Sequence, residues 1–133
     1  MASIFTRIIN GEIPCYKIAE DDRYFAFLDI SPLAKGHTLV VPRQETDYLF
    51  DLDDELLAGL MLFSRRVAQA IEAEVTCLRI GVAVIGLEVP HAHVHLVPLQ
   101  SMHDLDFAKD RVEMTTEEFS TLANRIAARF QSG

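Results

Sequence analysis

The sequence predicts one α+β domain, and three observations lead to that prediction. The chain has 133 residues, 50% of them hydrophobic, which fits a single hydrophobic core, so residues 1–133 are expected to form one domain. About five short apolar runs are mostly joined by short turns, which favours antiparallel strands because parallel neighbours need long crossovers. One long amphipathic pattern, over residues 53–75, predicts the central helix.

The first third of the chain is expected to give a short helix and three strands. Apolar residues at helical spacing over Ile4–Ile9 end at the turn dipeptide Asn10-Gly11. The runs Tyr16–Ala19 and Tyr24–Leu28 flank a polar turn, which predicts a hairpin. The run His37–Pro42 is apolar on both faces, so this strand is expected to be covered on both sides or to lie centrally in the sheet.

The remaining elements follow from periodicity and capping signals. The helix over residues 53–75 presents a wide apolar stripe that includes Leu56, Leu60, Phe63, Val67 and Ile71. Leu78–Ile85 is a β-branched apolar run, interpreted as a buried strand, and His91–Leu99 is interpreted as a further strand. Thr115-x-x-Glu118 is a capping-box pattern that opens a helix over residues 116–130.

Charge and composition exclude several classes of partner. The chain carries 12 Lys and Arg against 20 Asp and Glu, a formal charge of −8, so neither nucleic acid nor an anionic membrane surface is an expected partner. Cys15 and Cys77 are too few for a disulfide framework. With no signal-peptide pattern at the start and no apolar stretch long enough to span a bilayer, the chain is expected to be cytoplasmic.

Three of the five histidines lie at alternate positions in one short segment. His91, His93 and His95 share one face of the predicted strand, with successive rings expected roughly 6.6 Å apart from the strand rise. Such a row suits either zinc ligation or nucleophilic attack by a neutral imidazole on phosphorus. Because two charged rings at that distance would repel by about 2.5 kcal/mol at an effective dielectric constant of about 20, the three are not expected to be protonated together.

Beyond this row, the chain resembles the histidine-triad family. His91–Val97 fits the signature His-φ-His-φ-His-φ-φ, where φ is apolar. Ile4–Pro14, Phe27–Pro32 and Gly36–Pro42 are similar to the family's opening and middle segments, in the expected order. The resemblance covers about residues 4–100 and makes residues 101–133 a C-terminal extension. It implies a histidine-triad-like, mostly antiparallel five-stranded sheet with a long central helix, and a homodimer formed partly through that helix.

The resemblance also implies roles for individual residues. The predicted catalytic set is His93 as nucleophile, His95 as a contact to phosphate oxygens, His91 as the group that orients and polarises the nucleophile, and His37 as a supporting fourth histidine. Asp29 matches the acidic residue that accepts hydrogen bonds from ribose hydroxyls. An apolar clamp for the base is implied at Phe5, Ile8, Phe27 and Ile30.

The chain departs from the family pattern at two places. Ser3 and Thr6 stand where family members often carry a Cys-x-x-Cys half-site for zinc, so no metal and no cofactor are expected. The segment before the triad often carries a Gln and a hydroxyl residue that contact phosphate and leaving group. Here it contains Leu87, Glu88 and Val89; Glu88 and Val89 are included in the predicted nucleotide site, with the hypothesis that Glu88 relays a proton to the leaving group.

The resulting prediction is a hydrolase or transferase that acts on a small purine nucleotide. It would attack the α-phosphate of an adenylyl-type conjugate, such as a nucleoside phosphoramidate or a dinucleoside polyphosphate, through a covalent nucleotidyl-histidine at His93. A regulatory nucleotide-binding protein with incidental turnover is the alternative. A zinc protein that uses the histidine row is the third interpretation, and it predicts bound metal and loss of stability on chelation.

Overall fold

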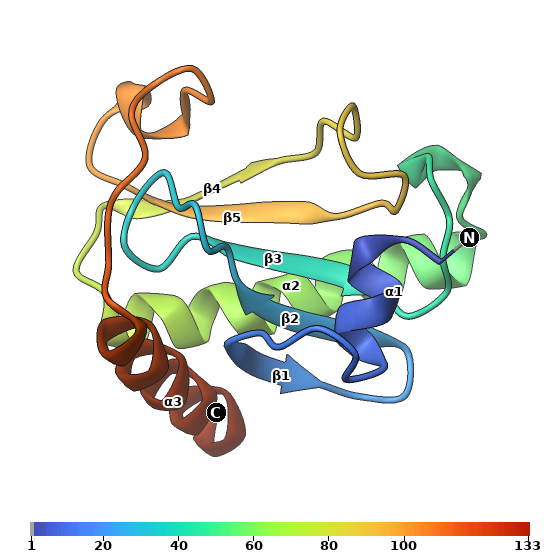
Figure 1. Ribbon diagram of the computed structural model, residues 1–133, viewed down its shortest axis with the longest axis horizontal. Helices are drawn as coiled ribbons and strands as arrows, with labels where there is room; N and C mark the ends of the chain where they lie inside the picture. Colours follow the sequence, from blue (N-terminus) through green and yellow to red (C-terminus); the bar gives the residue numbers. More distant parts are fainter. Residues whose placement is uncertain (1) are drawn as a thin grey trace.

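The chain folds around a five-stranded antiparallel sheet with the strand order β1-β2-β3-β5-β4 (Figure 1). The computed structural model describes residues 2–133. The strands are β1 (Lys17–Glu20), β2 (Tyr24–Leu28), β3 (Thr38–Pro42), β4 (Arg79–Ala83) and β5 (Val94–Leu99). The helices are α1 (Ile4–Ile9), α2 (Asp54–Glu74) and α3 (Thr116–Ser132), with short 3₁₀ turns η1 (Leu49–Asp51) and η2 (Met102–Leu105). The predicted α+β class is confirmed.

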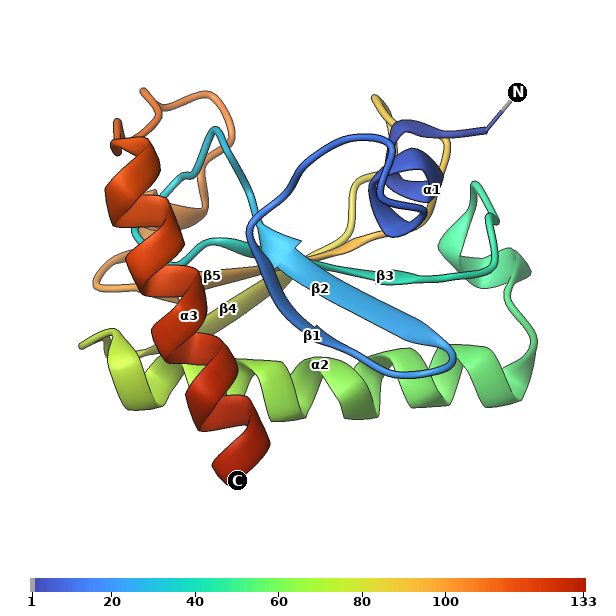
Figure 2. The same ribbon diagram turned by 60° about the horizontal axis from the view of Figure 1, so that its bottom comes forward.

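The two faces of the sheet are covered differently. Figure 2 shows α2 along one face with α3 crossing it, and α1 on the other side of the sheet. Val94 and Leu96 belong to the core on the α2 side. His95 faces the other way, because it pairs directly with Leu39, which lies in the phenylalanine-rich cluster around Phe5. The alternation along β5 therefore separates the imidazole side from the main core.

The three helices begin where local capping signals place them. α1 spans the predicted residues, with the Ser3 hydroxyl accepting from the Thr6 amide, and the Asp53 carboxylate caps α2 in the same way. α3 opens with the predicted capping box of Thr115 and Glu118, both hydrogen bonds of which are formed. No helix among residues 2–133 combines the length and apolarity needed to cross a bilayer.

Among the strands, β3 confirms its prediction and β4 contradicts one. β3 lies between β2 and β5 and is buried throughout. The prediction that Leu78–Ile85 is buried was wrong: β4 is the edge strand, and Val82 is 48% exposed. Apolar composition alone does not distinguish the two cases, because the burial of a strand depends on its place in the sheet.

The start of the last predicted strand also needs correction. β5 begins at Val94, so His91 and His93 precede it, although the prediction included both. The main chain there is bonded to loops: the Ala92 amide donates to the Thr46 carbonyl at 2.7 Å, and the His91 amide donates to the Val89 carbonyl at 2.8 Å. These bonds take the place of sheet hydrogen bonds in the segment that precedes Val94.

Candidate active site

The main chain selects one tautomer of the His93 ring. Its Nδ1 lies 2.8 Å from the carbonyl oxygen of His91. Because a carbonyl oxygen can only accept, the proton of the neutral ring lies on Nδ1 and the lone pair on Nε2. The ring keeps 7% exposure and lies edge-on to Phe5, with centroids 4.9 Å apart. This tautomer is the one that leaves Nε2 free for nucleophilic attack.

His91 is fully buried and serves as an anchor beneath His93. Its Nε2 donates to the carbonyl oxygen of Pro42 at 2.7 Å, which leaves Nδ1 to accept from the Ser3 hydroxyl at 2.7 Å. Burial is the main cause that lowers the pKa of His91 below its usual value. The ring is therefore neutral, and its main-chain oxygen is the group that orients His93.

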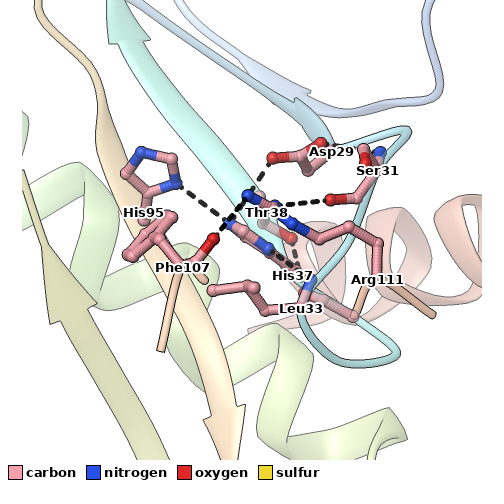
Figure 3. A network of polar contacts seen from close by, with 9 residues as sticks. Asp29, Ser31, Leu33, His37, Thr38, His95, Phe107 and Arg111 are labelled. Carbon is pink, nitrogen blue, oxygen red and sulfur yellow. Dashed lines mark hydrogen bonds and ion pairs between the residues drawn. The ribbon is translucent and has the colours of Figure 1, made fainter. Parts of the chain in front are cut away.

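A second hydrogen-bonded chain sets the protonation of His95, as Figure 3 shows. The Leu33 amide donates to Nδ1 of His37 at 3.0 Å, so the His37 proton lies on Nε2 and is donated to Nδ1 of His95, also at 3.0 Å. The remaining proton of His95 lies on Nε2. Burial, with smaller contributions from neighbouring charges, lowers the pKa of His37 to about 3 and that of His95 to about 4.

The spacing of the rings differs from the expected row. The ring centroids of His93 and His95 are 4.9 Å apart in an edge-to-face arrangement, closer than the roughly 6.6 Å expected from the strand rise. The rings tilt toward each other, and His93 precedes the strand. At this shorter distance, simultaneous protonation of His93 and His95 would be disfavoured more strongly than at the expected spacing.

Asp29 lies beside the His37–His95 pair at the end of β2. Its carboxylate accepts from the Ser31 amide at 2.8 Å, and its Oδ2 lies 3.6 Å from Nε2 of His37. Burial raises the pKa of Asp29, against the lowering effects of that hydrogen bond and of Arg111. The side chain is 17% exposed, so one edge of the carboxylate remains available to a ligand.

Three potential metal-ligand atoms, from Asp29, His37 and His95, lie within 4.8 Å of one another. The hydrogen bonds of the His37 ring, however, do not suit metal binding. A metal on Nε2 of His37 would place that ring's proton on Nδ1, against the Leu33 amide that already donates there. These three side chains are better described as a hydrogen-bonded group, in which His37 donates to His95 and Asp29 lies beside them.

Aromatic and aliphatic side chains line the α1 side of the site. Phe5 and Phe27 are buried, with ring centroids 5.6 Å apart, and Ile8 and Val89 pack against the same cluster. Ile30 is 73% exposed and lies at the rim. The structure brings four of these five predicted apolar residues together, with Ile30 outside the cluster.

Two residues of the C-terminal segment complete the site, and no sequence pattern indicated them. The ring of Phe107 lies edge-on to His95, with centroids 4.8 Å apart. Arg111 donates to the carbonyl oxygen of Ser31 at 2.8 Å and lies over the Phe107 ring at 5.7 Å (Figure 3). Residues 106–112 therefore form a strap that holds the rear of His95 against the β2–β3 loop.

The loop before the triad exposes its side chains to solvent. Leu87 is 87% exposed, and Glu88 is also exposed. The hypothesis that Glu88 relays a proton stays a prediction, because the described contacts do not fix its carboxylate.

A separate groove of about 700 Å³ lies between the end of α2 and the start of α3, and it includes none of the histidines. Its charged lining is mostly acidic, with Glu74, Asp104, Glu117 and Glu118 against Lys35 and Arg125. An anionic nucleotide is disfavoured there.

The fold and the site together define a class: an α+β protein with three histidines at the start of an inner strand of an antiparallel sheet, beside an apolar wall. A family model described as "HIT domain" matches residues 10–102. The chain belongs to this histidine-triad family.

Named relatives and solved structures agree with this membership. The chain is 32% identical to an adenosine 5′-monophosphoramidase of Schizosaccharomyces pombe over 98% of this chain and 100% of that protein. It is 39% identical to an adenosine 5′-monophosphoramidase of Saccharomyces cerevisiae over 73% of this chain and 62% of that protein. A zinc-bound histidine-triad protein of Mycobacterium smegmatis superposes with a TM-score of 0.84 at 30% identity, covering 99% of this chain and 97% of that one.

The residues near His91 do not fit a structural zinc ion. Nδ1 of His91 faces the hydroxyls of Ser3 and Thr6, at 2.7 and 3.4 Å. Structural zinc is held by thiolates, imidazoles and carboxylates, and neutral hydroxyls are poor substitutes. The two hydroxyls are also engaged in hydrogen bonds with His91 and Glu45.

Proposed function

We propose that this chain hydrolyses or transfers nucleotides at the α-phosphate of adenylyl-type conjugates, with His93 as the nucleophile. The observation that carries the proposal is the hydrogen bond from Nδ1 of His93 to the His91 carbonyl, because it leaves a lone pair on Nε2. His93 and His95 keep 7% and 8% exposure, whereas His91 and His37 have none. The two rings assigned to substrate are thus the two that solvent reaches. Similarity to two adenosine 5′-monophosphoramidases supports this substrate class.

The proposed reaction has two displacements at phosphorus. In the first, Nε2 of His93 forms a bond to the α-phosphorus while the bond from phosphorus to the leaving amine or phosphate breaks, and the leaving group takes up a proton from solvent water. His95, with its proton on Nε2, donates to a non-bridging oxygen as negative charge develops. In the second, the oxygen of a water molecule forms a bond to the phosphorus while the Nε2–phosphorus bond breaks; the proton lost by the water returns to solvent, the nucleoside monophosphate leaves, and Nε2 of His93 regains its lone pair.

Substrate binding is assigned to the flanks of the histidine row. The partly exposed Asp29 carboxylate suits the two ribose hydroxyls. The Phe5–Phe27 wall suits a purine base, since aromatic side chains offer large apolar faces. The positive electrostatic potential that an anionic substrate needs is provided at the site by the imidazole N–H donors and by Arg111, whose charge is felt at Asp29.

The test follows the products and the intermediate. The protein is incubated with adenosine 5′-phosphoramidate or a diadenosine polyphosphate, AMP release is followed, and intact mass after a rapid quench is searched for an adenylyl adduct. We expect an adduct on His93 and at least a 10³-fold loss of turnover in His93→Ala. His103→Gln, a change at an exposed position of η2, is the control. AMP binding with slow turnover that His93→Ala leaves unchanged would instead support a regulatory nucleotide-binding protein.

We also propose a cytoplasmic homodimer formed along β4 and α2. β4 is an edge strand with unpaired main-chain groups, and its Val82 lies beside Met61 and Leu62 of α2, which are 50% and 53% exposed. Within residues 2–133 the Ser64 hydroxyl next to this patch is buried without a hydrogen-bond partner. A second copy would pair the strand edge and cover the apolar side chains.

Light scattering coupled to gel filtration tests the dimer. The molar mass of the eluting wild type should be twice that of one chain, and Val82→Glu should lower the measured molar mass toward that of the monomer. Val112→Glu, at an exposed position away from β4, is the control. A monomeric wild type at micromolar concentration would contradict the proposal. The cytoplasmic assignment is supported by the two free thiols, Cys15 and Cys77.

A further inference from the structure

A network of four hydrogen bonds ties the N-terminal helix to the histidine row. Ser3 is only 6% exposed although it lies near the chain terminus. Its hydroxyl donates to Nδ1 of His91 at 2.7 Å and accepts from the Thr6 amide at 3.1 Å. The Ser3 amide and the Thr6 hydroxyl both donate to Oε1 of Glu45, at 2.6 and 2.7 Å. Residues far apart in sequence are thereby joined around one imidazole.

The direction of each proton in this network is fixed. The Pro42 carbonyl can only accept, so the His91 proton lies on Nε2 and Nδ1 needs a donor. The Ser3 hydroxyl is that donor. The Thr6 amide occupies an acceptor site of the same hydroxyl, and Glu45 holds the Ser3 main chain in place. Without the hydroxyl, His91 would have a buried acceptor with no partner.

The consequence reaches His93 by two routes. The carbonyl oxygen of His91 accepts the Nδ1 proton of His93, so a shift of His91 moves the group that selects the His93 tautomer. Phe5 lies between Ser3 and Thr6 in α1, and its ring is edge-on to both imidazoles, with centroids 5.8 Å from His91 and 4.9 Å from His93. The helix that carries the hydroxyls also carries the wall of the site.

We infer that Ser3, Thr6 and Glu45 are positioning residues that hold His91 as its Nε2–H tautomer and, through the His91 carbonyl, hold His93 as its Nδ1–H tautomer. None of the three touches the reacting atoms. The inference concerns the nucleophile of the proposed function and rests on it, but the ring tautomers can be measured without substrate.

The experiment measures ring ¹⁵N chemical shifts together with steady-state kinetics. In the wild type, the shifts should show protonated Nδ1 and unprotonated Nε2 for His93, with the reverse for His91. Ser3→Ala should allow the other His93 tautomer and lower kcat roughly 10- to 100-fold, as for a small displacement of a reacting group, with a smaller change in KM. Ser3→Thr, which keeps the hydroxyl, should restore the shifts and kcat.

Ser3 also caps α1, so a second cap serves as control. Thr115→Ala removes the hydroxyl cap of α3, far from the histidines, and should leave the shifts and kcat unchanged. If Ser3→Ala does not fold, Glu45→Gln and Thr6→Val give the same readout, with smaller expected effects. Unchanged His93 shifts and kcat in folded Ser3→Ala would overturn the inference. If the wild type releases no AMP, the proposed function fails, whereas the ring shifts still decide the positioning role.

Discussion

Acid should destabilise this protein through two buried neutral histidines. Burial lowers the pKa of His37 to about 3 and that of His95 to about 4, whereas the unfolded chain titrates near 6.5. Below pH 6.5 the unfolded state therefore binds more protons than the folded state, and the free energy of unfolding falls as pH falls. Above pH 6.5 both rings are neutral in both states, and the effect vanishes.

The magnitude follows from these pKa values. At pH 5 each histidine lowers the free energy of unfolding by about 2 kcal/mol relative to pH 8, so the pair contributes about 4 kcal/mol. This is a large part of the 5–15 kcal/mol typical of a folded domain. His91, whose pKa is also lowered, acts in the same direction.

Urea unfolding at several pH values between 8 and 5 measures the effect, with His37→Asn as the informative variant. The Asn oxygen can still accept from the Leu33 amide that now bonds to the ring, but it has no titratable group. The loss between pH 8 and 5 should be about 2 kcal/mol smaller in His37→Asn than in the wild type. His103→Gln is the histidine control. An equal loss in His37→Asn and wild type would refute the assignment of buried neutral rings.

Two further changes test the packing that supports the site. In Gly59→Ala the added Cβ would lie 2.0 Å from the Tyr24 hydroxyl, so it should destabilise by about 1–3 kcal/mol, although Ala is normally the better helix residue by about 1 kcal/mol; denaturant unfolding measures this, and Tyr24→Phe should reduce the loss. Phe107→Ala removes the ring that packs on His95 and should lower kcat several-fold, whereas Phe50→Ala, at a 68% exposed position, should not; equal effects would argue against the strap.

Local signals predicted the helices and most of the strands. Helical periodicity and turn or capping signals are encoded within a few positions, so the bounds of α1 followed from the apolar spacing and the Asn10-Gly11 turn, and the start of α3 from its capping box. The central place of β3 followed from its two apolar faces. The edge position of β4 could not be predicted in this way, because the apolar composition of a strand does not say whether it has a neighbour on one side or on both.

The histidine row was predictable as a group of residues, but its protonation pattern was not. The tautomer of each ring depends on hydrogen-bond partners that the motif does not contain: the hydroxyl of Ser3, from a distant segment, for His91, and the amide of Leu33, in the loop just before it, for His37. Phe107 could not be predicted as a site residue, because it lies in an irregular segment with neither helical nor strand periodicity. Its contact with His95 forms only when the C-terminal strap packs against the sheet.

Main-chain groups set most of the proton positions in the site, and this limits what a histidine motif can specify by itself. The Pro42 and His91 carbonyls and the Leu33 amide each fix one ring nitrogen. No side-chain substitution removes these groups, so the proton order depends on how the main chain is folded before β3, at the end of β3 and before β5. The same three histidines placed on a different loop framework would keep the spacing of the motif and lose the free lone pair on His93.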